Sequence, residues 1–165
     1  TDDSAISFST KKLGEEIIPV AKLSDHKQDA ILHNYYTTKL LERLLQRIST
    51  ETGLSSNELI VIHYLSCFPN SNVTKDMSLF TDINQFLLVP LLEKLVFNEY
   101  VTRVKSSDFE TYYSLTQKAK SITKQLNQLT QDFDSIRFAG IEPSTQKLLQ
   151  STEETIYENI RQKLT

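Results

Sequence analysis

Apolar residues recur at helical spacing over most of the chain. The pattern predicts a first helix over 25–48, followed by a stop at Gly53. A second helix begins at Ser55, because Ser55 followed three residues later by Glu58 is a capping-box pattern. The most regular pattern comes later and predicts a long helix with a heptad seam, which requires a partner helix along its length. The seam residues are Leu115, Ala119, Ile122, Leu126, Leu129, Phe133 and Ile136.

The two ends of the chain give shorter patterns. We expect Gly140 to end the long helix in the left-handed conformation and Pro143 to open a last helix. Near the start, residues 13–20 are compatible with a short helix or an extended arm, and Pro19 argues against a long helix. We interpret residues 1–23 as an arm packed on the body. The apolar stripe of the last helix consists of Leu149, Ile156, Ile160 and Leu164.

The middle of the chain combines helical and strand patterns. Residues 73–80 can form about two helical turns. Asp82 followed by Gln85 is another capping-box pattern, and it predicts a second helix over 83–97. Two β-prone runs with a polar loop between them then predict a hairpin. Helix, tight turn, helix and hairpin is the order of a winged helix-turn-helix, a DNA-reading module. The β-prone runs are Tyr100–Val104 and Thr111–Leu115.

Several of these segments resemble the MarR-type bacterial regulators in order and spacing. Asn98-Glu99-Tyr100 replaces the glycine turn that is usual in that family, and is closer to its staphylococcal accessory regulator (SarA-like) branch. The resemblance covers about 54–120 and implies a mainly α fold (α+β), a winged helix-turn-helix with flanking long helices that form a dimerisation domain. The matching segments are 54–65, 91–95, 99–103 and 114–116.

Pattern and resemblance together predict the organisation of the chain. The resemblance implies a cytoplasmic homodimer whose two heads bind a palindromic operator in double-stranded DNA and regulate transcription. It also implies a small-molecule effector, which could bind where the first, second and fifth helices meet and change the head spacing. An intrachain antiparallel helix pair is the alternative partner for the heptad seam. The predicted parts are an arm (1–23), a first dimerisation helix (24–53), the DNA-binding region (54–115) and C-terminal dimerisation helices (116–165).

Composition excludes several classes of protein. The 165 residues are 39% hydrophobic and 24% charged, which is typical of a globular chain with a real core. No apolar run approaches the roughly 20 residues that span a bilayer, so we expect no membrane partner. A single cysteine fits a reducing compartment, and three glycines provide no nucleotide-binding loop. We therefore expect no cofactor and no enzymatic activity.

The charge of the chain is a weak argument against nucleic-acid binding. The net charge is −3. Residues 73–120 contain six basic and six acidic residues, so the net charge of this region is zero. Affinity for phosphates comes from Lys and Arg, so a basic stripe would be expected in this region of a DNA-binding protein. The sequence shows none, although the fold could still segregate the two signs on its surface.

Candidate DNA contacts lie at three places in the predicted reading unit. Asn and Gln can bind adenine edges, and the start of a helix favours phosphate, so the tip of the reading helix is the first place. The wing provides the second place, and the first short helix the third. If the leucines of the reading helix face the core, its outer face is apolar, and it could contact thymine methyls or a protein. The candidates are Asn84, Gln85 and Phe86; Arg103, Lys105, Ser106 and Ser107; and Thr74 and Lys75.

The sequence also departs from the family at these places. Pro90 stands where arginine is common, and the wing tip at 107–111 lacks the arginine that enters the minor groove in relatives. These departures favour an alternative function, a winged-helix protein-interaction module without DNA binding. Loss of the tip arginine also predicts weaker minor-groove reading.

Other reactive side chains give no strong signal. We interpret Cys67, at the end of the second helix, as a buried structural thiol, and His63 as a partly buried histidine. His26, Asp29 and His33 share one helix face, which leaves a zinc-responsive regulator as a second alternative. With no cysteine near them, we assign no metal site and no catalytic residue.

Overall fold

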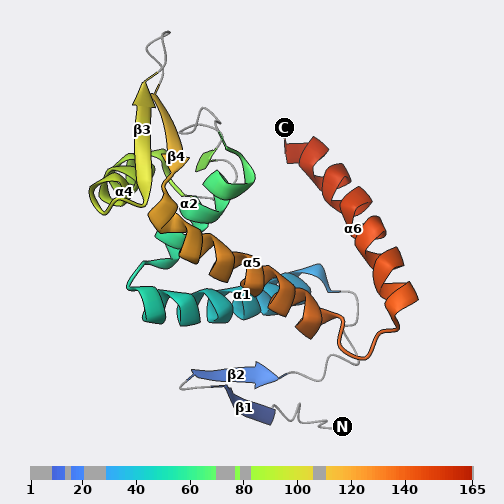
Figure 1. Ribbon diagram of the computed structural model, residues 1–165. Coiled ribbons are helices and arrows are strands. Elements are labelled where there is room, and N and C mark those ends of the chain that lie inside the picture. The colour runs from blue at the N-terminus through green and yellow to red at the C-terminus, as the bar shows by residue number, and fades with distance from the viewer. Residues whose placement is uncertain are drawn as a thin grey trace, which may run out of the picture. The chain divides into compact units, whose positions relative to one another are not determined.

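The computed structural model describes residues 9–13, 16–20, 29–69, 77–78, 83–105 and 111–164 (Figure 1). The chain divides into two compact units, 1–40 and 41–165, which are described separately. None of the described helices is long and apolar enough to cross a membrane. The elements are β1 (Ser9–Leu13), β2 (Glu16–Val20), α1 (Ala30–Thr52), α2 (Ser56–Cys67), α4 (Gln85–Phe97), β3 (Val101–Lys105), β4 (Thr111–Leu115), η2 (Gln117–Ala119), α5 (Lys120–Arg137) and α6 (Pro143–Leu164).

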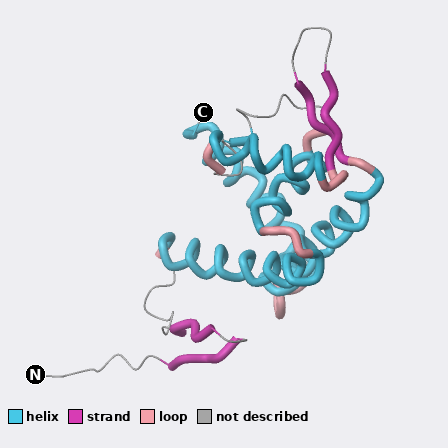
Figure 2. Tube along the Cα trace, turned by 90° about the vertical axis from the view of Figure 1, so that its left-hand side faces the viewer, coloured by secondary structure: helices cyan, strands magenta, loops and turns pink. Residues whose placement is uncertain are grey.

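The first unit opens with an antiparallel hairpin of β1 and β2 (Figure 2). Of the two conformations that the sequence left open here, the structure has the extended one, with Pro19 opposite Thr10 in a two-stranded sheet. The first helix begins at Ala30, five residues after the predicted start. The reason is that the Asp29 carboxylate caps it, accepting the N–H groups of Ile31 and Leu32 at 3.0 Å each.

The second unit is built around α2, which contacts α4, β4 and α5. Leu59, Val61 and Ile62 of α2 are fully buried, so this helix is apolar nearly all round, as expected of a helix inside a core. On α4, three of the four predicted core leucines are fully buried, whereas Leu91 is partly exposed. The fully buried leucines of α4 are Leu88, Leu92 and Leu95.

The buried carboxylate of Glu58 joins α2 to α4. The predicted capping box is confirmed: the Glu58 N–H donates to Ser55 Oγ (3.2 Å), and the Ser55 N–H donates to Glu58 Oε2 (2.7 Å). The other carboxylate oxygen, Oε1, lies 3.1 Å from Lys94 Nζ on α4. Burial raises the pKa of Glu58, but the hydrogen bonds from Ser55 and the ammonium of Lys94 outweigh burial and hold the pKa below its ordinary value.

The predicted winged hairpin is confirmed as β3 and β4. The strands pair antiparallel from Val101 opposite Leu115 to Lys105 opposite Thr111. Both views show this hairpin projecting beyond the helices of its unit (Figures 1 and 2). The predicted first short helix lies mostly outside the described residues, but Met77 and Ser78 are helical and Met77 is fully buried.

The turn from α4 into the wing is a Schellman motif. The Tyr100 N–H donates to Leu95 O (2.9 Å), and the Glu99 N–H donates to Val96 O (3.0 Å). Glu99 has φ +62°, and it is the one described non-glycine residue with positive φ. A side chain is strained in this left-handed conformation, and a carboxylate is unfavourable at the C-terminal end of a helix.

The heptad seam of α5 is covered along only part of its length. Ala119, Ile122, Leu126 and Leu129 are buried, whereas Ile136 near the far end is 52% exposed. The predicted stop is confirmed by Gly140, which has φ +80°, and α6 begins at Pro143 as expected.

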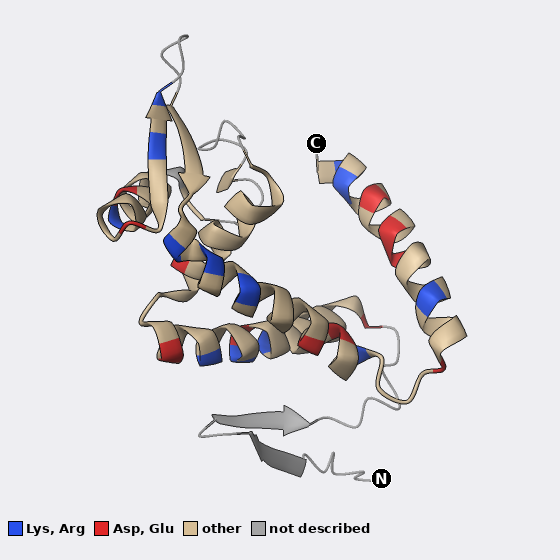
Figure 3. Cartoon of the chain, in the orientation of Figure 1, with Lys and Arg blue, Asp and Glu red and all other residues tan. Residues whose placement is uncertain are grey.

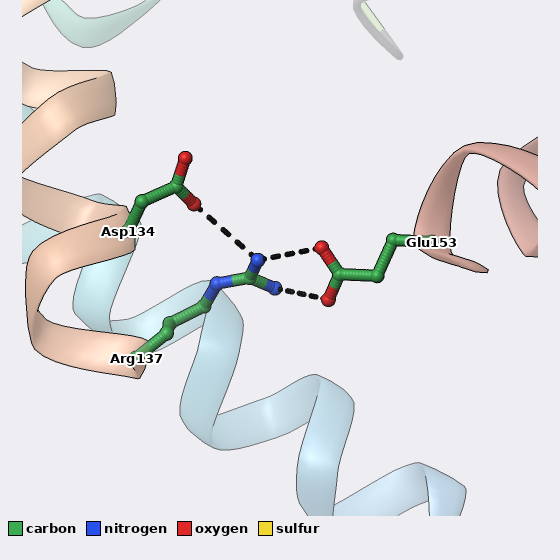
Figure 4. A network of polar contacts seen from close by, with 3 residues as sticks. All are labelled: Asp134, Arg137 and Glu153. Atoms are coloured by element: carbon green, nitrogen blue, oxygen red, sulfur yellow. Dashed lines mark hydrogen bonds and ion pairs between the residues drawn. The ribbon is translucent and has the colours of Figure 1, made fainter. Parts of the chain in front are cut away.

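Arg137 at the end of α5 binds α6 through a paired carboxylate (Figure 4). Its two terminal nitrogens donate to Glu153 Oε1 (3.0 Å) and Oε2 (2.8 Å), and one also contacts Asp134 at 3.3 Å. Hydrogen bonding to Glu153 is the main reason that the pKa of Arg137 is raised. This bidentate pair fixes α6 to the end of α5.

We expect Glu58→Gln to lower the free energy of unfolding by about 2 kcal/mol at pH 7, because charged hydrogen bonds are lost inside the core. The Glu58 pKa is lowered by folding, so its contribution is present above about pH 4.5 and is lost as pH falls through the folded value. Urea unfolding at pH 7 and pH 3 should therefore show a gap between the two proteins that narrows in acid. An equal gap at both pH values would contradict this account of Glu58.

We expect Glu99→Gly to raise the free energy of unfolding by about 1 kcal/mol, because glycine adopts the left-handed conformation without strain. Glu99→Ala is the matched control, since it removes the carboxylate but keeps Cβ. Urea unfolding should show a clear gain for the glycine variant over the alanine variant. Equal gains would assign the effect to the charge at the helix end instead of the backbone.

Candidate nucleic-acid interface

The tip of α4 is capped by Asn84. Its Oδ1 accepts the Phe86 N–H at 2.9 Å, and the first residue of the helix is Gln85. The helix therefore begins two residues later than the predicted start at Ile83, and Asp82 lies outside the described residues. Asn84 was predicted to read adenine with both atoms of its amide, but here its amide oxygen is already used by the backbone.

The outer face of α4 is apolar and exposed, as the sequence predicts. Phe86 is 88% exposed in the first turn, and Phe97 is 86% exposed at the other end. Leu87, at 62%, is also exposed, which the leucine stripe did not predict. The helix continues through Pro90, which has no N–H to donate to the carbonyl of Phe86.

The two charged side chains of α4 are engaged within the chain. Lys94 pairs with the buried Glu58, and Glu93 pairs with Arg103 of β3. Arg103 donates a hydrogen bond to the Glu93 carboxylate, and this bond, together with the negative charge of the carboxylate, raises the pKa of Arg103. Arg103 was predicted to contact phosphate, but the structure places it in an ion pair that ties the wing to α4.

Between residues 83 and 120, the other basic groups that the structure describes lie on the wing and at the start of α5 (Figure 3). Lys105 is exposed at the end of β3, and its ammonium makes no ion pair with any residue that the structure describes. Lys118 was not singled out by the sequence. Its ammonium donates to Asn98 O (2.9 Å) and lies 4.7 Å from the centre of the Tyr100 ring. Lys118 therefore binds the carbonyl at the C-terminal end of α4.

Four predicted contacts lie outside the described residues. These are Thr74, Lys75, Ser106 and Ser107.

Cys67 is exposed, so its interpretation as a buried thiol is wrong. It ends α2 at the surface, where its Sγ lies 3.7 Å from His63 Nε2. Burial lowers the pKa of His63, which keeps this imidazole neutral near pH 7. Within the described part of the chain, no three His, Cys, Asp or Glu residues could hold a metal ion together. His26 lies outside the described residues, and the Asp29 carboxylate is used as a helix cap.

Comparison with solved structures finds this arrangement of elements in MarR-family transcriptional regulators. A MarR-family transcriptional regulator from Silicibacter pomeroyi superposes with a TM-score of 0.69, at 19% identity over 86% of this chain and 95% of that one. A MarR-family regulator from Listeria monocytogenes, complexed with a 26mer DNA, gives 0.70, at 11% identity over 83% and 92% of the two chains. The chain has the winged-helix fold of the MarR-family regulators.

A MarR-family protein from Mycobacterium tuberculosis, in complex with p-aminosalicylic acid, gives a TM-score of 0.62 at 16% identity, over 77% of this chain and 97% of that one. No protein-family model and no curated protein matches the sequence. The fold prediction is therefore confirmed by structures whose sequences are less than 20% identical to this one. In this fold, α4 holds the position of the second helix of the helix-turn-helix, and β3 and β4 form the wing.

We expect Glu93→Gln to free Arg103 for a phosphate and to steepen the salt dependence of DNA binding. The slope of log K against log salt should become more negative by about 0.9 for each phosphate that a freed Arg103 contacts. Fluorescence anisotropy on a labelled duplex at several salt concentrations measures this slope. In an Arg103→Gln background the same substitution should leave the slope unchanged. If Glu93→Gln changed the salt slope equally with Arg103 and with Gln at position 103, loss of the negative charge, and not release of Arg103, would explain the change.

Proposed function

We propose that this protein is a transcriptional regulator of MarR type that binds double-stranded DNA sequence-selectively as a homodimer. The observation that carries the proposal is the exposed outer face of α4 beside the wing of β3 and β4. In a winged helix this face meets base edges in the major groove. Support also comes from the likeness to a structure of this fold that holds DNA.

The homodimer is supported by apolar surface that one chain leaves uncovered. No side chain of α6 is buried, although this helix carries an apolar stripe. A two-fold dimer would cover such surfaces and place two reading heads on the half-sites of a palindrome. The far end of the α5 seam is exposed as well. The exposed apolar residues of α6 are Leu148, Ile156, Tyr157, Ile160 and Leu164.

A small-molecule effector is proposed between α1 and α5. A shallow pocket there is lined by both apolar and charged side chains, including Ile48, Arg47 and Asp132. A ligand that binds one head spacing better than another would shift the population toward it. The likeness to a structure that holds p-aminosalicylic acid supports a ligand site in this fold. Glu99 at the α4 turn, in place of glycine, supports the SarA-like branch, and the protein would act in the bacterial cytoplasm.

The proposed DNA contacts are those of the sequence, with two changes. Arg103 reaches phosphate only if its pair with Glu93 opens. Asn84 contacts DNA through its amide N–H groups, because its amide oxygen caps the helix. The others stay as predicted: Thr74 and Lys75 in the first short helix, Gln85 and Phe86 at the tip of α4, and Lys105, Ser106 and Ser107 in the wing.

The test is selection of duplexes from a random DNA library by the purified protein. The selection is done at about 0.15 M salt, where non-specific affinity is much weaker than specific affinity. We expect a palindromic consensus whose binding is weakened by Gln85→Ala. The apolar face of α4 favours a second candidate function, a protein-interaction module. Recovery of no consensus, with residual binding that salt does not change, would contradict DNA reading and support that module.

A further inference from the structure

We propose that this protein selects its DNA site through the C5-methyl groups of thymine, which Phe86 contacts in the major groove. The inference rests on the proposed function and names the chemical feature that the reading helix recognises. It concerns the base edges of the operator, and it adds an apolar ring to the polar contacts that the proposed function places at the tip of α4.

The first step is that the charged side chains of α4 are held within the chain and are not free to read bases. Within the described part of the helix, the charged residues are Glu93 and Lys94, and both are held in ion pairs with other elements. Direct readout through hydrogen bonds needs side chains whose donors and acceptors are available to base edges. The Asn84 amide oxygen already accepts one hydrogen bond, from the Phe86 N–H, which fixes its orientation as a helix cap.

The second step is that the same helix presents apolar side chains to solvent at its reading end. Phe86 is 88% exposed and Leu87 is 62% exposed, both in the first turn. Residues at the N-terminal end of a recognition helix are those that contact base edges. An exposed phenylalanine there has one apolar partner in the major groove, the thymine methyl, which is absent from the other three bases.

The third step is that the position of Phe86 is fixed before DNA arrives. The Asn84 cap holds its N–H at 2.9 Å, and Leu88, two residues further along, is fully buried against the core. Because the backbone of this first turn is already ordered, little conformational entropy is lost when the Phe86 ring contacts DNA. The apolar contact therefore contributes more to affinity than the same contact on a disordered segment would.

A matched control exists on the same helix. Phe97 is the same residue type, is 86% exposed, and lies eleven positions away, which is close to three helical turns. The two rings therefore share one face of α4 but are separated by about 16 Å along its axis. Only Phe86 lies at the end that reads bases.

The experiment compares the 165-residue protein and two variants, Phe86→Ala and Phe97→Ala, on the duplex selected from the random library. Each is titrated against that duplex and against the same duplex with deoxyuridine in place of thymine in the consensus positions. Deoxyuridine keeps every hydrogen-bonding group of thymine and lacks only the C5-methyl. Both rings are exposed, so neither substitution is expected to disturb folding, and circular dichroism checks this.

For each thymine methyl that the unsubstituted protein contacts, we expect the Kd for the deoxyuridine duplex to be about fourfold higher. The factors for the two half-sites multiply. Phe86→Ala should bind both duplexes with nearly equal Kd. Phe97→Ala should keep the full preference for thymine.

Three results would overturn the inference. A selected consensus bound equally well with thymine or deoxyuridine would overturn methyl reading and leave the proposed regulator standing. A preference for thymine that Phe97→Ala abolishes as fully as Phe86→Ala would remove the assignment to the tip of α4. Selection of no consensus at all would overturn both this inference and the proposed function, and would leave the apolar face as a surface for a protein.

Discussion

The second unit depends on how one buried carboxylate is satisfied. Glu58 lies inside the core, where an unpaired charge would be strongly destabilising. The Ser55 N–H donates to the Glu58 carboxylate and the Glu58 N–H donates to Ser55 Oγ, and these two hydrogen bonds fix the start of α2. Lys94 of α4 pairs with the same carboxylate. The leucines of α4 are then buried beside α2, and the Schellman turn after α4 sets the direction of β3. The wing and the reading helix therefore share one anchor.

The charged side chains of α4 serve the scaffold. Lys94 pairs with the buried Glu58, and Glu93 pairs with Arg103 of the wing. Among the described side chains at the tip of the helix, Phe86 and its neighbour Leu87 are exposed and apolar. A chain with a net charge of −3 and an ion-paired wing arginine would depend on shape and apolar contact more than on phosphate neutralisation.

Local patterns predicted most of the fold because each element carries its own signals. The capping box at Ser55, the stop at Gly140 and the strands of the wing depend on nearby residues, and all three were confirmed. The start of α4 was misplaced because Asp82 and Asn84 offer competing caps. The pairing of Arg103 and the exposure of Cys67 depend on contacts between distant segments, which spacing along the chain does not reveal.

The proposed contact places the Phe86 ring against a thymine methyl in the bound state. Nuclear Overhauser spectroscopy can detect this contact in a complex of the selected duplex with deuterated protein that carries protonated phenylalanine. We expect cross-peaks between the Phe86 ring and thymine methyl protons, identified by their loss in Phe86→Ala. Phe86 signals that stay at their free-protein shifts, with no cross-peak to DNA, would contradict it.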